Sequence, residues 1–88
     1  MGANTSPVQP EMHVTNPKEI SYFNRHIQQA KRVIEIMKTH FGWIAYIEQD
    51  GNQFRVKTGT FAGIATARTA ENKINAARLA LVTYIFEA

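Results

Sequence analysis

The chain has 88 residues, which suffices for one small domain, and its 44% hydrophobic and 19% charged residues are ordinary for a globular protein. Its formal net charge of +3 is compatible with an acidic polymer as partner, but it lies far below the charge density of a dedicated DNA-binding protein. The chain has no cysteine, which excludes disulfides, thiol chemistry and cysteine metal sites. It also lacks an apolar run of about 18 residues, so the sequence predicts no transmembrane helix.

The first ten residues, Met1 to Pro10, are small, polar and proline-bearing, which is the composition of a flexible linker or tail. We favour a linker within a larger protein, with a natural short tail as the alternative. The domain itself is expected over residues 11–88. It opens with a short predicted strand, Glu11 to Thr15, which alternates apolar and polar residues and carries His13 on its polar side.

A long helix is predicted to follow this strand. Asn16 is a favourable N-cap, Pro17 suits the first helical position, and Glu19 at the third position completes a capping box. Apolar residues then recur at three- and four-residue spacing along one helix face. They are Ile20, Phe23, Ile27, Ala30, Ile34, Met37 and Phe41. Gly42 is expected to end the helix.

A β-hairpin is predicted in the middle of the chain. Trp43 to Gln49 is rich in strand formers, and Asp50-Gly51 signals a tight turn. The next strand, Gln53 to Phe61, alternates between a core row and a polar row. The core row is Phe54, Val56 and Thr58, and the polar row is Gln53, Arg55 and Lys57.

A second helix and a closing strand complete the predicted order. The helix starts at Ala62-Gly63 and has an apolar face formed by Ile64, Ala67, Ala70, Ile74, Ala77 and Leu81. The last strand is Val82 to Glu87, whose residues 82–85 repeat the pattern of residues 44–47. The order strand, helix, strand, strand, helix, strand predicts an α+β, ferredoxin-like βαββαβ domain. Its four-stranded antiparallel sheet is expected to have both helices on one face and an open opposite face.

The segment from Phe54 to Phe61 (FRVKTGTF) resembles a strand of the SPOR (sporulation-related repeat) domain family. That strand reads aromatic-Arg-Val-x-x-Gly-x-Phe and leads directly into the second helix. Small and aliphatic residues on the following helix fall at the family's places: Ala67, Ala70 and Ile74. Gly42 to Ile47 is similar to the family's Gly-Tyr-x-Ala-Tyr-type start of the second strand. The resemblance covers residues 11–87, although residues 12–17 lack the family's first-strand glutamine and Gly-Ser-Phe-like corner.

The resemblance implies a non-catalytic module that binds peptidoglycan glycan strands stripped of their stem peptides. Such modules target amidases, division proteins or phage endolysins to the wall. The implied partner is therefore a covalently fused catalytic or anchoring domain, such as that of an N-acetylmuramoyl-L-alanine amidase. The implied place of action is the bacterial cell wall or periplasm, with no nucleic acid and no membrane insertion by this domain. The family places its ligand on the exposed sheet face.

Six residues are predicted to bind the glycan: Gln53, Arg55, Lys57, Tyr46, Tyr84 and His13. Arg55 and Lys57 lie about 7 Å apart along one side of their strand and are suited to carboxylates. The carboxamide of Gln53 is suited to amide and hydroxyl groups. The two tyrosines, related by the internal repeat, are suited to stacking on sugar rings. A shallow face of this kind predicts an affinity on the order of micromolar to millimolar.

Four of these residues also have a purely structural interpretation. The two basic residues are also typical of strand charges that discourage edge-to-edge pairing, and the two tyrosines are also typical of the rim of a core. We expect Trp43 and Phe61 in the core, and we expect Gly59 to serve the backbone at the corner between strand and helix.

Catalysis, cofactors and metal binding are not predicted. The histidines do not form a metal set, since His26 and His40 lie fourteen residues apart on one predicted helix. The chain has no apparent Ser/His/Asp or Cys/His arrangement and no phosphate-binding glycine loop.

Two other functions fit the same element order. An RRM-like domain that binds single-stranded nucleic acid uses aromatic residues on its open sheet face, but the third strand here presents Gln53, Arg55 and Lys57 instead. A small regulatory domain whose sheet pairs with a second copy is the other alternative.

Overall fold

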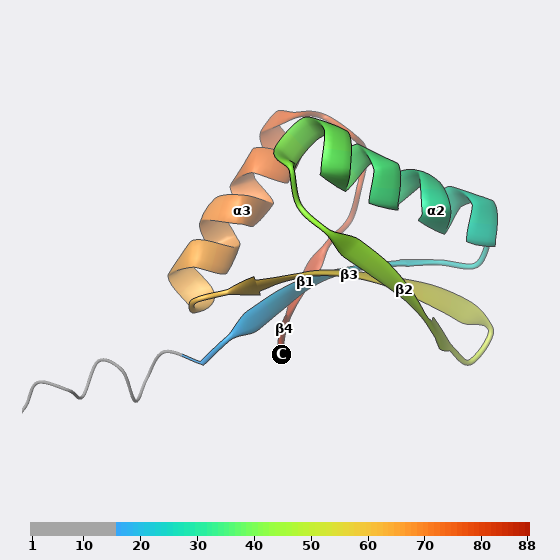
Figure 1. Ribbon diagram of the computed structural model, residues 1–88, viewed down its shortest axis with the longest axis horizontal. Coiled ribbons are helices and arrows are strands. Elements are labelled where there is room, and N and C mark those ends of the chain that lie inside the picture. The colour runs from blue at the N-terminus through green and yellow to red at the C-terminus, as the bar shows by residue number, and fades with distance from the viewer. Residues whose placement is uncertain (1–15) are drawn as a thin grey trace, which may run out of the picture.

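The computed structural model describes residues 16–88, so the predicted linker Met1 to Pro10, the strand Glu11 to Thr15 and His13 lie outside the described residues. The elements appear in chain order in Figure 1. They are β1 (Lys18–Asn24), α2 (Ile27–Ile36), the π-helical turn η1 (Met37–Phe41), β2 (Ala45–Asp50), β3 (Gln53–Phe61), α3 (Ile64–Ala76) and β4 (Tyr84–Glu87).

The four strands form one antiparallel sheet in the order β2-β3-β1-β4. Both helices lie on the same side of this sheet (Figure 1), and they contact its strands from that side alone. The predicted α+β, ferredoxin-like architecture is confirmed. One face of the sheet is therefore covered by helices, and the other is left open.

The predicted helix start at Asn16 to Glu19 is wrong, because residues 18–24 form strand β1. Ile20 is buried in the core, whereas Phe23 pairs with Arg55 on the opposite face of the sheet. Their three-residue spacing fits a helical stripe, but the segment is rich in strand formers. Because β1 pairs with both β3 and β4 at the centre of the sheet, this long-range pairing outweighs the local capping pattern.

Helix α2 begins after a short turn in which Asn24 Oδ1 accepts a hydrogen bond from the backbone N–H of His26 at 2.8 Å. From this point the predicted helical stripe is confirmed except at Ile27, which is 40% exposed. Its members Ala30, Ile34, Met37 and Phe41 belong to the core or pack against it. Gly42 ends η1 with a φ of 72°, a left-handed conformation that favours glycine.

The hairpin and strand β3 agree closely with the sequence prediction. Asp50 pairs with Gln53, so the connection is a two-residue turn in which Gly51 has a φ of 62°. Strand β3 has the predicted bounds, and its inward residues Val56 and Thr58 are buried. Strand β2 begins at Ala45, two residues later than predicted.

The second helix is shorter than the sequence pattern predicts. Helix α3 ends at Ala76 rather than near Leu81, because Arg78 and Ala80 adopt φ angles of 54° and 57° that cannot continue a right-handed helix. Strand β4 likewise begins at Tyr84 rather than at Val82. Residues 77–83 therefore form an irregular connection between α3 and the sheet.

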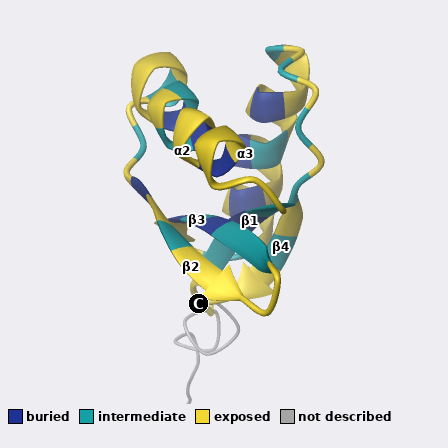
Figure 2. Ribbon diagram, turned by 90° about the vertical axis from the view of Figure 1, so that its right-hand side faces the viewer, coloured by how far each residue is buried: buried dark blue, intermediate teal, exposed yellow. Residues whose placement is uncertain are grey.

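The hydrophobic core lies between the helical layer and the sheet, where Figure 2 shows the buried parts of both layers facing each other. It is built from Ile20, Ala30, Val33, Met37, Ala45, Val56, Ala70 and Ile74. Alanines of α3 allow that helix to approach the sheet closely, and the larger side chains fill the space beneath α2. The core consequently uses only the inward row of each strand and leaves the outward row free for other roles.

Candidate binding face of the sheet

The sheet face opposite the helices, called the open face from here on, is defined by strand register. Because side chains alternate along a strand, residues paired across neighbouring strands share a face. Ser21 lies opposite both Lys57 and Tyr84, and Tyr46 also lies opposite Lys57. The open face consists of Glu19, Ser21, Phe23, Tyr46, Glu48, Asp50, Gln53, Arg55, Lys57, Tyr84 and Phe86.

Five of the six predicted site residues are brought together on this face by three different strands. They are Tyr46 on β2, Gln53, Arg55 and Lys57 on β3, and Tyr84 on β4. The sixth, His13, lies outside the described residues. The two tyrosines are half exposed, at 53% and 50%, so their rings are accessible to a ligand.

Arg55 is the centre of the open face. Its Nε–H donates a hydrogen bond to Ser21 Oγ at 2.8 Å, and its terminal nitrogens lie 3.6 Å from Glu19 Oε1 and 4.0 Å from Glu48 Oε1. Its guanidinium carbon lies 4.5 Å from the ring centroid of Phe86, a cation–π distance. Ser21 is fully buried beneath these contacts. The guanidinium is therefore held by the protein itself, and it fixes the positions of the groups around it.

Lys57 is also paired within the face. Its Nζ lies 3.5 Å from Glu48 Oε2, and the Glu48 side chain is 56% exposed. Glu48 thus joins the two basic residues of β3 from the neighbouring strand. The result is a row of alternating donors and acceptors rather than a positive patch, an arrangement suited to hydroxyl and amide groups that both donate and accept hydrogen bonds.

Two aromatic residues of the open face, Phe23 and Phe86, are not among the site residues predicted from the sequence. The Phe23 ring makes edge contacts with Tyr84 at 6.0 Å and with Phe86 at 6.1 Å between centroids. The three- and four-residue spacing of apolar residues places Phe23 in the predicted helical stripe, and no sequence pattern distinguishes Phe86. A period-two reading of residues 19–23, with Ile20 inward, is the signal that would have found Phe23.

Trp43, Phe61 and Gly59 have the structural roles expected of them. Trp43 stacks on Phe41 at 4.5 Å and meets the edge of Phe61 at 5.5 Å, and all three rings pack against the core. Gly59 has a φ of 156°, and a Cβ at this position would lie 3.0 Å from the backbone oxygen of Lys18. Glycine is required here by the close approach of β1, at the point where the β1–β3 register shifts.

Charge is distributed unevenly between the two layers. The four strands carry three cations (Lys18, Arg55 and Lys57) against four carboxylates (Glu19, Glu48, Asp50 and Glu87). The helices and their flanking loops carry seven cations (Arg25, Lys31, Arg32, Lys38, Arg68, Lys73 and Arg78) against two carboxylates (Glu35 and Glu71). Within residues 16–88, the excess of positive charge therefore lies in the helices and their flanking loops, and the open face is close to neutral.

Within residues 16–88, no group of three or more His, Cys, Asp or Glu side chains is arranged to hold a metal ion. No helix in this part of the chain is long and apolar enough to cross a membrane.

Comparisons with known proteins give no further guide. The chain matches no protein-family model, no curated protein sequence and no solved structure at a significant level. The function must therefore be argued from the chemistry of the open face and from the resemblance of residues 54–61.

Proposed function

We propose that this domain binds glycan strands of peptidoglycan through its open face and has no catalytic activity of its own. The observation that carries the proposal is the composition of that face: accessible aromatic rings next to ion-paired, hydrogen-bonding side chains, with almost no net charge. Pyranose rings present flat C–H-rich faces that suit aromatic side chains, and their edges carry hydroxyl and acetamido groups. Both kinds of group find a partner on the open face.

The shape of the face supports a linear ligand. Tyr46 and Tyr84 lie on the two outer strands, and Lys57 and Ser21 lie between them in one continuous row. Strands in a sheet are about 4.8 Å apart, so this row spans roughly 14 Å, enough for several consecutive sugar contacts. A flat face without a deep cleft also fits a binding module of moderate affinity that gains its strength from fusion to an enzyme or from several copies.

Arg55 and Lys57 have different roles under this proposal. The guanidinium of Arg55 is already engaged by Ser21, Glu19 and Glu48, so it orients the face. Among residues 16–88, Lys57 has one carboxylate partner, Glu48, at 3.5 Å, and the Glu48 side chain is exposed. Lys57 is the group that meets the lactyl carboxylates exposed when stem peptides are removed from the glycan.

The resemblance of residues 54–61 to the SPOR family supports the same ligand class. With it comes the proposal that the domain acts in the bacterial cell wall or periplasm and is fused to a hydrolase, such as an amidase or endolysin, or to a division protein. The observed β1 presents Glu19, Ser21 and Phe23 on the open face and no glutamine. Under this proposal, β1 contributes to binding through these residues rather than through the glutamine of the family's first strand.

A pull-down with purified sacculi tests the proposal. We expect retention on sacculi that rises after amidase treatment, because the treatment removes stem peptides and exposes bare glycan. The double variant Phe23→Ser/Tyr84→Ser should lose retention. Ile64→Ser, which changes a half-exposed apolar residue on the helical side, is the matched control and should be retained like the unmodified protein. No retention on either sacculus preparation would contradict the proposal.

Binding of single-stranded nucleic acid is the second candidate, and Phe23, Tyr84 and Phe86 on one sheet face are the observation that favours it. The charge distribution weighs against it, because a nucleic-acid backbone needs unpaired cations beside the stacking rings. Both open-face cations of β3 are ion-paired, and the remaining cations of residues 25–78 lie on the helical side. A strongly salt-dependent shift with single-stranded RNA, without binding to glycan, would reverse this order.

A further inference from the structure

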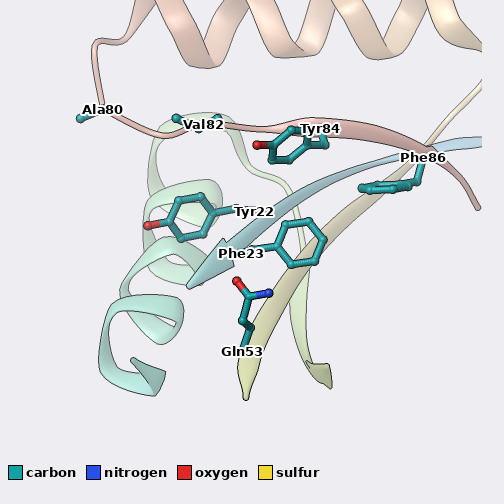
Figure 3. A pocket seen from close by; sticks show the side chains of 7 residues that line it. All are labelled: Tyr22, Phe23, Gln53, Ala80, Val82, Tyr84 and Phe86. Atoms are coloured by element: carbon teal, nitrogen blue, oxygen red, sulfur yellow. The ribbon is translucent and has the colours of Figure 1, made fainter. Parts of the chain in front are cut away.

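A groove opens at one end of the open face, where β1 extends beyond its pairing with β4. The β1–β4 ladder covers only Lys18 to Ser21, so residues 22–24 of β1 have no strand on that side. The irregular connection that follows α3 runs past this gap before it becomes β4. The groove between them has a volume of about 590 Å³ and is shown in Figure 3. Its lining residues are Tyr22, Phe23, Gln53, Ala80, Val82, Tyr84 and Phe86.

Among residues 16–88, the lining contains four aromatic rings, two aliphatic side chains and one carboxamide, but no charged side chain. The nearest cation on the open face is Arg55, whose guanidinium carbon lies 4.5 Å from the ring centroid of the lining residue Phe86. Because Arg55 is already ion-paired with Glu19 and Glu48, the groove favours neutral ligand groups. Gln53 is its one carboxamide, and that side chain makes no hydrogen bond to any other group within residues 16–88. The volume lies within the range of about 300–1,000 Å³ that is typical of ligand pockets.

We infer that this groove is a subsite for one N-acetylhexosamine residue and that it reads the acetamido group. The inference rests on the proposed function and names what the open face selects within the glycan. The sugar ring stacks on Tyr84 and meets Phe23 at its side, because the rings of these two neighbours in Figure 3 lie at 62° to each other with their centroids 6.0 Å apart. Gln53 exchanges hydrogen bonds with the acetamido amide, and the acetamido methyl packs against Val82.

Two features of the groove favour an acetamido sugar over other neutral groups. A plain hexose would leave the carboxamide of Gln53 without an amide partner and the apolar wall at Val82, which is 67% exposed, without a methyl group to cover it. A nucleobase would fit between the aromatic rings, but its phosphates would have to lie along a face whose two β3 cations are already paired with carboxylates.

Chitotetraose and cellotetraose share the β-1,4 linkage, but only chitotetraose carries acetamido groups. Comparing their affinities therefore isolates the contribution of the acetamido group. We expect the full chain to bind chitotetraose about tenfold more tightly than cellotetraose, as one hydrogen bond and one covered methyl group together predict. Binding is measured by titration calorimetry and by NMR chemical shifts of the groove residues. Gln53→Leu should weaken chitotetraose binding by roughly three- to tenfold and leave cellotetraose binding unchanged. Val82→Ser should reduce the same preference without touching the core.

Gln28→Leu, an exposed glutamine of α2, is the matched control and should change neither affinity. Equal affinity for the two tetrasaccharides, or equal loss of both in Gln53→Leu, would overturn the subsite while leaving the proposed glycan binding in place. Failure to bind either tetrasaccharide together with failure to bind sacculi would overturn the proposed function itself. Binding of single-stranded RNA with shifts at Tyr84 and Gln53, in competition with chitotetraose, would assign the groove to a nucleobase instead.

Discussion

Arg55 shows how a single charged residue organises the open face of the sheet. Its guanidinium contacts side chains on all three other strands of the sheet. They are Glu19, Ser21 and Phe23 on β1, Glu48 on β2 and Phe86 on β4. The contact with Ser21 matters most, because a fully buried hydroxyl group without a partner is costly, whereas partly exposed ion pairs contribute little. Arg55 therefore has a structural role that Lys57, on the same strand, does not share.

Replacing these two residues by leucine separates the roles. Arg55→Leu should lower the free energy of unfolding by about 1–3 kcal/mol, because Ser21 loses its hydrogen-bond donor. Lys57→Leu should change it by less than about 1 kcal/mol, since only one ion pair to an exposed carboxylate is lost. Urea unfolding followed by circular dichroism measures both values. Equal effects of the two substitutions would contradict the role given to Arg55.

A second prediction concerns the effect of a side chain at Gly59 on stability. Gly59→Ala should destabilise the fold by about 1–3 kcal/mol, because the added Cβ meets the backbone of β1 at 3.0 Å and the φ of 156° disfavours a side chain. Gly51→Asn is the control. Gly51 also has a positive φ, but it has open space around it, and asparagine tolerates its left-handed conformation. Thermal unfolding of the two variants should differ clearly, and similar midpoints would argue against a steric requirement at Gly59.

At the scale of elements, the sequence predicted the second half of the domain better than the first. The residues of strand β3 alternate strictly between apolar and polar, and a turn signal and a glycine corner bound the strand. Local sequence is therefore sufficient to predict β3. Strand β1 carries apolar residues at positions 20 and 23, which fit both a strand and a helical stripe. Pairing with β3 and β4 decides between the two, because the local patterns of residues 16–23 are compatible with either. The helical interpretation leaves Phe23 out of the predicted site, whereas five of the six predicted site residues do lie together on the open face.

The two interpretations of β1 make different predictions for Ile20 and Phe23. In the strand, Ile20 is 1% exposed in the core, so Ile20→Ala should cost about 2–5 kcal/mol of unfolding free energy. Phe23 lies on the open face, so Phe23→Ala should cost less than Ile20→Ala and should mainly weaken ligand binding. A helix would bury both side chains in one stripe and make both substitutions costly. Chemical denaturation of the two variants, together with glycan titration, distinguishes these outcomes.

At the scale of the whole molecule, the helices with their flanking loops differ in charge from the sheet. The helical side carries seven cations against two carboxylates, whereas the strands are nearly balanced. Glycan binding at the open face should therefore change by less than about twofold between 50 and 200 mM salt, whereas binding that depends on six to ten phosphate contacts would weaken by about 10³–10⁵. The double variant Lys31→Glu/Arg68→Glu should leave glycan affinity unchanged. A steep salt dependence, or loss of binding in this variant, would place the ligand on the helical side.

NMR titration with amidase-treated glycan fragments tests whether the open face of the sheet binds glycan strands. We expect amide and aromatic shifts to cluster at Gln53, Arg55, Lys57, Tyr46 and Tyr84, and to extend to Phe23 and Phe86. Residues of α2 and α3 should stay unperturbed. Shifts confined to the helices, or no shifts at millimolar glycan, would contradict glycan binding at the open face.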